Sequence, residues 1–186
     1  MTNESRKELA LEIINNIELQ NIMAPPDIFG GKSKVMKSVI VDNFFGYSPE
    51  NPIPCNDVYG EECYISRLRE DGTDAAVMFH RLGSTKGDLH MVDTFECITA
   101  TGNYFKLYLD MYYYNQISAA PKGFHLAERS DGLTGFSYGY IKSFPEIYAE
   151  IEKYAKKVYG YPIVDSSIKL SKEGLDSLKK IVNHYK

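Results

Sequence analysis

The sequence predicts an α+β fold: an antiparallel β-sheet built from consecutive hairpins, with one N-terminal and two C-terminal helices packed on one face. Two observations predict it. Apolar residues recur at helical spacing near both ends of the chain, and they alternate at strand spacing through the middle. Of the 186 residues, 44% are hydrophobic and 25% are charged. These are ordinary values for one globular domain, which we expect to span residues 1–186.

The first helix is expected to begin near Ser5. Ser5 and Glu8 have the spacing of a capping box, in which each side chain satisfies a free backbone N–H. An apolar stripe follows at intervals of four: Leu9, Ile13 and Ile17. We expect the helix to stop before Pro25. Prolines and glycines interrupt residues 22–60, which predicts a long irregular segment with one short strand at 35–41.

The first hairpin is expected at an Asp-Gly turn at 71–72, because both central positions of a type I′ turn need positive φ. It would pair residues 63–70 with 73–82 and set Cys63 beside His80. A thiol beside an imidazole is the minimum for an activated nucleophile. A small buried cysteine next to a half-exposed histidine is the plainer interpretation of the same pair.

The second hairpin contains an unusual strand, because residues 103–115 hold five of the fifteen tyrosines. A tight Gly-Asn turn at 102–103 would pair it with residues 90–101. Alternate residues of a strand point to opposite faces, so one face is apolar and belongs to the core. The other face, called the tyrosine face below, collects Tyr104, Tyr108, Asp110, Tyr112 and Tyr114, opposite Phe95 and Asp93. This register places Glu96 on the apolar face.

The tyrosine face is the candidate binding surface, because tyrosine combines a large rigid area with a polar tip. Tyrosine is also frequent in strands, so a layer beneath a helix or loop explains it equally. On this face Asp93 and Asp110 would be diagonal neighbours. They have the residue types for acid–base work, or they are solvated and inert. Glu96 is either a ligand-gripping acid or a structurally hydrogen-bonded one.

A third hairpin is expected at 123–142, with its turn at 129–132, and two helices then close the chain. Ser143 and Glu146 repeat the capping-box spacing at the start of the first of these helices. The second is expected to begin near Ser171.

Neither a cofactor nor a metal is expected. The three cysteines lack CxxC spacing and the four histidines lack HExxH spacing, which indicates reduced thiols and no zinc site. FGGKS at 29–33 is similar to the end of a phosphate-binding loop, but Pro26 stands where the first glycine belongs. A polar N-terminus and the absence of any apolar run near ~20 residues predict a cytoplasmic protein without a membrane anchor.

Charge is uneven along the chain. Residues 42–74 hold eight acids and two bases, and the whole chain has a formal net charge of −4. This balance argues against a nucleic-acid partner and favours a basic protein partner.

The sequence therefore favours a non-catalytic binding protein that engages a macromolecular partner through the acidic segment and the tyrosine face. An inhibitor or toxin-immunity role is compatible with these features. The alternative is a small-molecule-binding or acid–base enzyme domain whose tyrosine-lined pocket contains Asp93, Asp110 or Glu96. A homodimer that buries the tyrosine face against its own copy also stays open. A pocket with Asp110 and two or more tyrosine hydroxyls would favour the alternative.

Overall fold

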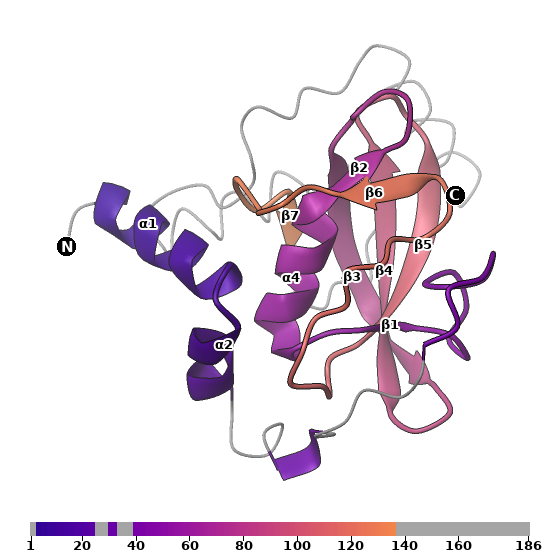
Figure 1. Cartoon of the computed structure of the whole chain (residues 1–186), viewed down its shortest axis with the longest axis horizontal. Helices are drawn as coiled ribbons and strands as arrows, with labels where there is room; N and C mark the ends of the chain where they lie inside the picture. Colours follow the sequence, from indigo (N-terminus) through magenta and orange to yellow (C-terminus); the bar gives the residue numbers. More distant parts are fainter. Residues whose placement is uncertain (1–2, 25–29, 33–38, 137–186) are drawn as a thin grey trace.

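The computed structural model describes residues 3–24, 30–32 and 39–136 (Figure 1). Its helices are α1 (Asn3–Ile14), α2 (Ile17–Met23) and α4 (Asp57–Arg67). Its strands are β1 (Ile53–Pro54), β2 (Leu68–Glu70), β3 (Val77–Lys86), β4 (Met91–Thr99), β5 (Tyr104–Asp110), β6 (Phe124–Leu126) and β7 (Gly135–Phe136). The α+β prediction is confirmed at this level. The two closing helices lie outside the described residues, as does most of the strand expected at 35–41. The third hairpin expected at 123–142 is wrong in its described part, because β6 pairs with β2 and β7 pairs with β3.

The N-terminal helix is present but divided in two. Asn16 has an extended backbone, and its side chain accepts hydrogen bonds from the N–H groups of Glu18 (3.0 Å) and Leu19 (3.2 Å). This is N-cap geometry, so the chain turns at Asn16 and a second helix begins. α2 ends at Met23, before Pro25, as expected.

The main sheet of the described residues has the strand order β1-β5-β4-β3-β7. Its three central strands are antiparallel, whereas β1 runs parallel to β5 and β7 parallel to β3. A separate two-stranded sheet joins β2 and β6. The parallel edges were not expected from a chain of consecutive hairpins.

The first hairpin prediction is wrong, because residues 57–67 form α4. Fully buried residues of this helix have helical spacing: Glu61, Tyr64 and Ile65, with Leu68 at the C-cap continuing it. The helical spacing is hard to recognise in the sequence, because one of the buried residues, Glu61, is an acid. Cys63 therefore lies on a helix and His80 on β3, so they are not cross-strand neighbours. Burial raises the pKa of the Cys63 thiol, which disfavours the nucleophilic thiolate.

The turn at 71–72 is also longer than expected. Asp74 donates its N–H to the Glu70 carbonyl (2.9 Å), and Gly72 and Asp74 both have positive φ (80° and 56°). Arg69 consequently pairs with Ala76 and not with Asp74.

The β4–β5 hairpin exists, but its register differs by three residues from the expected one. Phe95 pairs with Leu107, where a two-residue turn would have paired it with Asp110. Four residues, 100–103, form the connection, and Thr99 closes it by donating its N–H to the Asn103 carbonyl (3.0 Å). An odd slip moves every partner residue to the other face. Phe95 and Asp93 therefore share a face with the core leucines of β5, away from Tyr104 and Tyr108.

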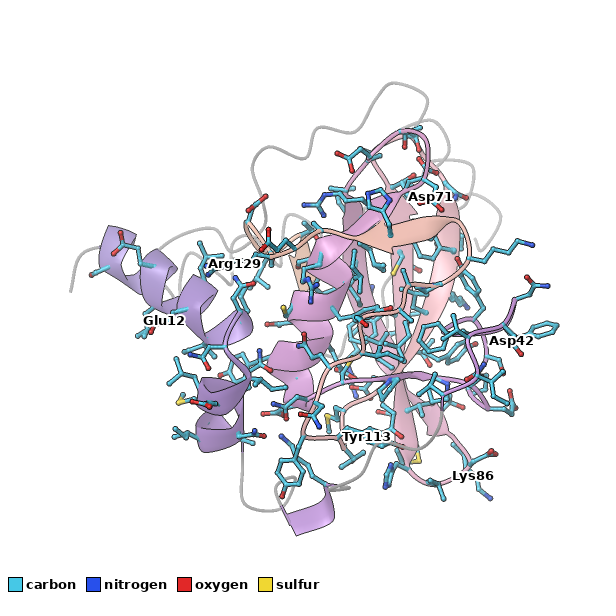
Figure 2. All side chains as sticks on the ribbon, viewed as in Figure 1. Glu12, Asp42, Asp71, Lys86, Tyr113 and Arg129 are labelled. Atoms are coloured by element: carbon cyan, nitrogen blue, oxygen red, sulfur yellow. The ribbon has the colours of Figure 1, made fainter. Side chains whose placement is uncertain are left out.

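The core lies between the sheet and a second layer made of α4 and the β2–β6 ribbon (Figures 1 and 2). Tyr64 and Ile65 of α4 meet Phe95, Leu107 and Leu109 of the sheet, and all five are fully buried. α1 and α2 pack on the side of α4 that faces away from the sheet (Figure 1). They do not lie on the sheet as expected. None of the helices in the described ranges has both the length and the apolar content to cross a bilayer.

Candidate functional site: an acidic pocket at the end of β5

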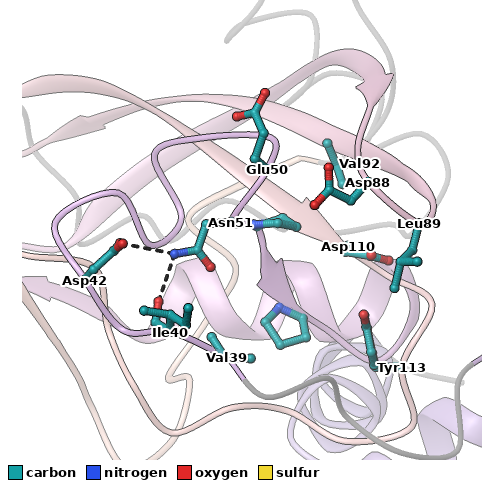
Figure 3. Close-up of a pocket in the computed structure, with 12 residues that line it drawn as sticks. Val39, Ile40, Asp42, Glu50, Asn51, Asp88, Leu89, Val92, Asp110 and Tyr113 are labelled. Atoms are coloured by element: carbon teal, nitrogen blue, oxygen red, sulfur yellow. Dashed lines mark hydrogen bonds between the residues drawn. The ribbon is translucent and has the colours of Figure 1, made fainter.

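A pocket of about 320 Å³ opens where β5 ends (Figure 3). Three segments form it: residues 39–54, the connection between β3 and β4 with the start of β4, and residues 110–113. The residues that line it are Val39, Ile40, Asp42, Glu50, Asn51, Pro52, Pro54, Asp88, Leu89, Val92, Asp110 and Tyr113. Its volume lies at the small end of the range that ligand pockets span.

The segments meet because β1 pairs with β5. Pro54 lies beside Asp110 in the parallel ladder, and Cys55 donates its N–H to the Asp110 carbonyl (2.7 Å). On the other side, Gly87 donates its N–H to the His90 carbonyl (3.0 Å) and closes a four-residue turn. That turn brings Asp88 and Leu89 to the mouth of the pocket.

Depth divides the lining into two parts. The floor is buried and is made of Pro54, Val92, Asp110 and Tyr113. The exposed rim carries the acids Asp42, Glu50 and Asp88 together with Ile40 (69% exposed) and Leu89 (63% exposed). A ligand group that enters the pocket would pass these charged and apolar rim residues before it reaches the buried Asp110 carboxylate.

Charge in the pocket has one sign. Four of the lining residues are carboxylic acids, and among the residues that the structure describes no lysine, arginine or histidine lines it. Hydrogen bonds from Ser48 and from the Glu50 backbone lower the pKa of Glu50 and favour its charged form. Like charges in one concave site repel each other, and a bound cation would relieve that repulsion.

Asp110 is held in place from two sides. Its Oδ1 accepts the Tyr112 backbone N–H (3.1 Å), and its Oδ2 lies 2.9 Å from Nδ1 of His90. The His90 ring lies 5.0 Å from the Tyr112 ring and 5.9 Å from the Tyr113 ring, measured between centroids. These contacts fix the carboxylate at the floor before any ligand arrives.

Asn51 fixes the opposite wall. Its amide nitrogen donates to the Ile40 carbonyl (2.8 Å) and to Oδ1 of Asp42 (3.1 Å), as the dashed lines in Figure 3 show. Asp42 also accepts the Phe44 backbone N–H (2.8 Å). Both amide protons of Asn51 are used, whereas no hydrogen bond to its side-chain Oδ1 is found among the described residues, so Oδ1 can accept a donor.

Tyr113 is 5% exposed, and its hydroxyl has no hydrogen-bond partner among the described residues. Figure 3 shows the hydroxyl pointing into the pocket toward Asp110. Burial, with a smaller contribution from Asp110, raises the pKa of Tyr113, so the phenol stays neutral. The hydroxyl is not one of the fully buried atoms that lack a partner in the described structure, so it is open to the space of the pocket and can bond to a group that enters.

The tyrosine face does not form one surface. β5 ends at Asp110, and Tyr104 and Tyr108 are half-buried on the strand itself. Tyr112 pairs with Asn56 in an isolated bridge beyond the strand, and the Tyr114 ring lies 5.6 Å from Nζ of Lys32. Of the seven residues assigned to this face, only Asp110 lines the pocket.

Asp93 and Phe95 belong to the other side of the sheet, which corrects their expected place. Phe95 is fully buried in the core. Asp93 binds Arg81 through two hydrogen bonds (2.7 and 2.9 Å) and accepts the Ser84 hydroxyl (2.7 Å). It therefore cannot act with Asp110 as an acid–base pair.

Glu96 changes face for the same reason. It pairs with Lys106 and accepts a hydrogen bond from the Tyr104 hydroxyl (3.3 Å), so it shares a side with the tyrosines of β5. Oε1 of Glu96 lies 3.9 Å from Nδ1 of the fully buried His80. Glu96 is buried and does not line the pocket.

The acidic segment 42–74 is divided among three places. Asp42 and Glu50 lie at the pocket, whereas Asp57, Glu61 and Glu62 are buried on α4. The remaining acids lie at the turn after β2, where His125 contacts Asp71 (2.9 Å) and Asp74 (3.1 Å). Within the described residues, the acids of this segment therefore do not lie on one surface.

The sequence interpretation missed His90, Asp88, Leu89 and Tyr113. The Gly-Asp pair at 87–88 could have indicated this part of the site, because it predicts a turn, and that turn places Asp88, Leu89 and His90 near the end of β5. Lys32 of the FGGKS stretch is buried, and it donates to Oδ1 of Asn56 (2.5 Å). It is therefore occupied by a protein contact.

No protein-family model, curated protein or solved structure matches the chain. In the part of the chain that the structure describes, no group of three or more His, Cys, Asp or Glu side chains is arranged to hold a metal ion. Function is therefore inferred from the pocket.

Proposed function

We propose that this protein is a non-catalytic binding protein whose acidic pocket receives a basic side chain of a protein partner. The observation that carries the proposal is the combination of four carboxylic acids with apolar walls in one cavity of about 320 Å³. Complementary charge favours a cationic group there and raises the rate of encounter. The apolar walls suit a hydrocarbon stem that joins such a group to a larger molecule.

The surroundings of the pocket favour a macromolecule over a free ligand. Ile40 and Leu89 at the rim are largely exposed, as are Val41 and Phe44 in the same loop. Exposed apolar groups rimmed by polar ones are typical of protein interaction sites. A protein partner would cover them, whereas a small ligand inside the pocket would not. An inhibitor or toxin-immunity role fits such a surface, and a cytoplasmic location stays a prediction.

One observation supports an enzyme or small-molecule site as the second candidate. The His90–Asp110 contact is the arrangement in which a carboxylate orients a histidine for general-base work. However, an enzyme or small-molecule site was expected to have two or more tyrosines in the pocket, and only Tyr113 lines it among the described residues. His90 is not among the lining residues either. The binding role therefore has the stronger support.

A peptide titration tests the proposal. We expect a fluorescent peptide of alternating basic and leucine residues to bind, with an affinity that falls as salt increases. Glu50→Gln/Asp88→Asn should weaken it about tenfold or more, because two rim charges are lost. Asp71→Asn/Asp74→Asn removes the same charge at the distant turn and should leave the affinity within about twofold. Absence of binding, or equal losses in both variants, would refute a role for the pocket.

A further inference from the structure

We infer that the pocket selects a primary ammonium group on a straight aliphatic stem, that is, a lysine side chain of the partner, over the guanidinium of arginine. This inference rests on the proposed function and names the group that the pocket takes. It is carried by Tyr113, whose side chain is 5% exposed and whose hydroxyl, without a hydrogen-bond partner among the described residues, points into the cavity beside the buried Asp110 (Figure 3).

The acceptors of the pocket suit three separate hydrogen bonds. Asp110 and Tyr113 lie at the floor, and Asn51, whose side-chain Oδ1 is the acceptor, lies on the wall. An ammonium group carries three donors that rotate about one bond, and it has no acceptor. The hydroxyl oxygen of the neutral Tyr113 can therefore accept a hydrogen bond from one of these N–H groups.

The Asp110 contacts disfavour a guanidinium group. Arginine binds a carboxylate best through two parallel N–H···O bonds, one to each oxygen. In this protein Oδ1 already accepts the Tyr112 N–H, and Oδ2 is engaged by His90. Each oxygen can still accept one further donor, which suits a point-like ammonium group better than a rigid planar fork.

The path to the floor suits a hydrocarbon stem. Ile40 and Leu89 stand at the mouth, and Pro54 and Val92 lie deeper. The four methylenes of a lysine side chain can lie along such a surface while the charged end reaches the carboxylate. The rim acids Asp42 and Glu50 then lie where other basic residues of the partner can approach them. We therefore assign the ammonium group to a protein lysine and not to a free amine.

Two matched peptides test the inference by fluorescence anisotropy. Both are alanine-rich, with one central basic residue between two leucines, and they differ only in lysine against arginine. We expect the lysine peptide to bind at least about tenfold more tightly, because its ammonium group would make one additional charged hydrogen bond in the pocket. Free 1,5-diaminopentane should compete only at far higher concentrations, because it covers none of the exposed rim.

Three variants complete the design. Tyr113→Phe removes one hydroxyl and should lower the affinity for the lysine peptide about tenfold. Tyr108→Phe removes a hydroxyl outside the pocket and should leave it unchanged. Leu89→Arg, at an exposed position, places a cation at the mouth and should abolish binding without touching the Asp110 contacts. Thermal melts of each variant identify any loss of folding.

The outcomes separate the two proposals. A lysine preference that depends on Tyr113 supports the inference. Equal or tighter binding of the arginine peptide, or an unchanged affinity in Tyr113→Phe, overturns the inference while the basic-partner function stands. Diaminopentane that binds as tightly as the peptide overturns the assignment to a protein lysine. Binding of neither peptide overturns the proposed function as well.

Discussion

Phe95 separates the two possible registers of the β4–β5 hairpin. In the observed register it pairs with Leu107 and is fully buried, and its ring lies 5.8 Å from the Phe79 ring in an edge-on contact. In the register expected from a two-residue turn it would lie on the tyrosine face. Phe95→Ala should therefore cost much free energy of unfolding in the first case and little in the second.

The expected loss follows from burial. A phenylalanine side chain buries roughly 200 Å², and at about 25 cal/mol per Å² this gives about 5 kcal/mol as an upper bound. Alanine keeps part of that area, whereas the empty space left beside Phe79 adds a cavity term. We expect a decrease of about 4 kcal/mol. That is a large fraction of the ~5–15 kcal/mol that stabilises a typical domain.

Urea denaturation followed by far-UV circular dichroism measures this loss. The midpoint should move down with little change in the slope m, because the same surface is exposed on unfolding. Tyr108→Ala is the matched control, because Tyr108 is half-buried on the opposite side of the same ladder and should cost about 1 kcal/mol. A loss below about 1.5 kcal/mol for Phe95→Ala would show that the core register is not the one described.

Three further predictions concern stability. The pKa of Glu61 is raised well above 4.5 by burial and by Asp93, so the folded state keeps a proton that the unfolded state releases. The free energy of unfolding therefore falls as pH rises from about 4.5 toward the folded-state pKa. The melting temperature of Glu61→Gln should rise relative to that of the wild type over the same range. A difference in melting temperature that does not change with pH would contradict the assignment. Asn16→Ala should cost about 1 kcal/mol in urea by removing the α2 cap, and Asn16→Asp should retain most of it. Gly135→Ala should cost about 2 kcal/mol or more, because the new Cβ would collide with the Phe79 carbonyl oxygen; a melting temperature equal to that of the wild type would argue against the β3–β7 pairing.

The internal alternation of β5 was predictable, but its pairing was not. Leu107 and Leu109 are buried in the core, as alternation predicted, because strand geometry alone decides which residues share a face. β4 gives no such signal. Phe95 and Cys97 on one face and Val92 and Ile98 on the other are all buried. With both faces closed, the sequence cannot distinguish a slip of three residues, and the four-residue turn decides the register.

The sequence failed to predict helix α4 for a related reason. Its buried face includes Glu61, which carries a carboxyl group without any hydrogen-bond partner in the described structure. A helical period is recognised by its apolar residues, and an acid in the middle of the stripe breaks it. Asp57 adds to the difficulty, because it begins the helix with a positive φ of 63°, a conformation that is uncommon for residues other than glycine. The apolar residues that remained, Tyr64, Ile65 and Leu68, were taken for part of a strand.

The candidate site was predictable only in part, because a parallel pairing creates it. The sequence singled out Asp110 and the acidic segment that holds Asp42 and Glu50, but it gave no reason to place them together. They meet because Ile53–Pro54 pairs with Leu109–Asp110, across more than 50 residues, through two residues that look like a proline-broken loop. Proline cannot donate to a ladder, so Pro54 suits an edge strand, where one side of the backbone needs no partner. That edge leaves room for a pocket beside the last residue of β5, and the Gly87–His90 turn closes its other side. These two contacts, neither of which the sequence predicts, therefore bring acids from distant parts of the chain together in one pocket.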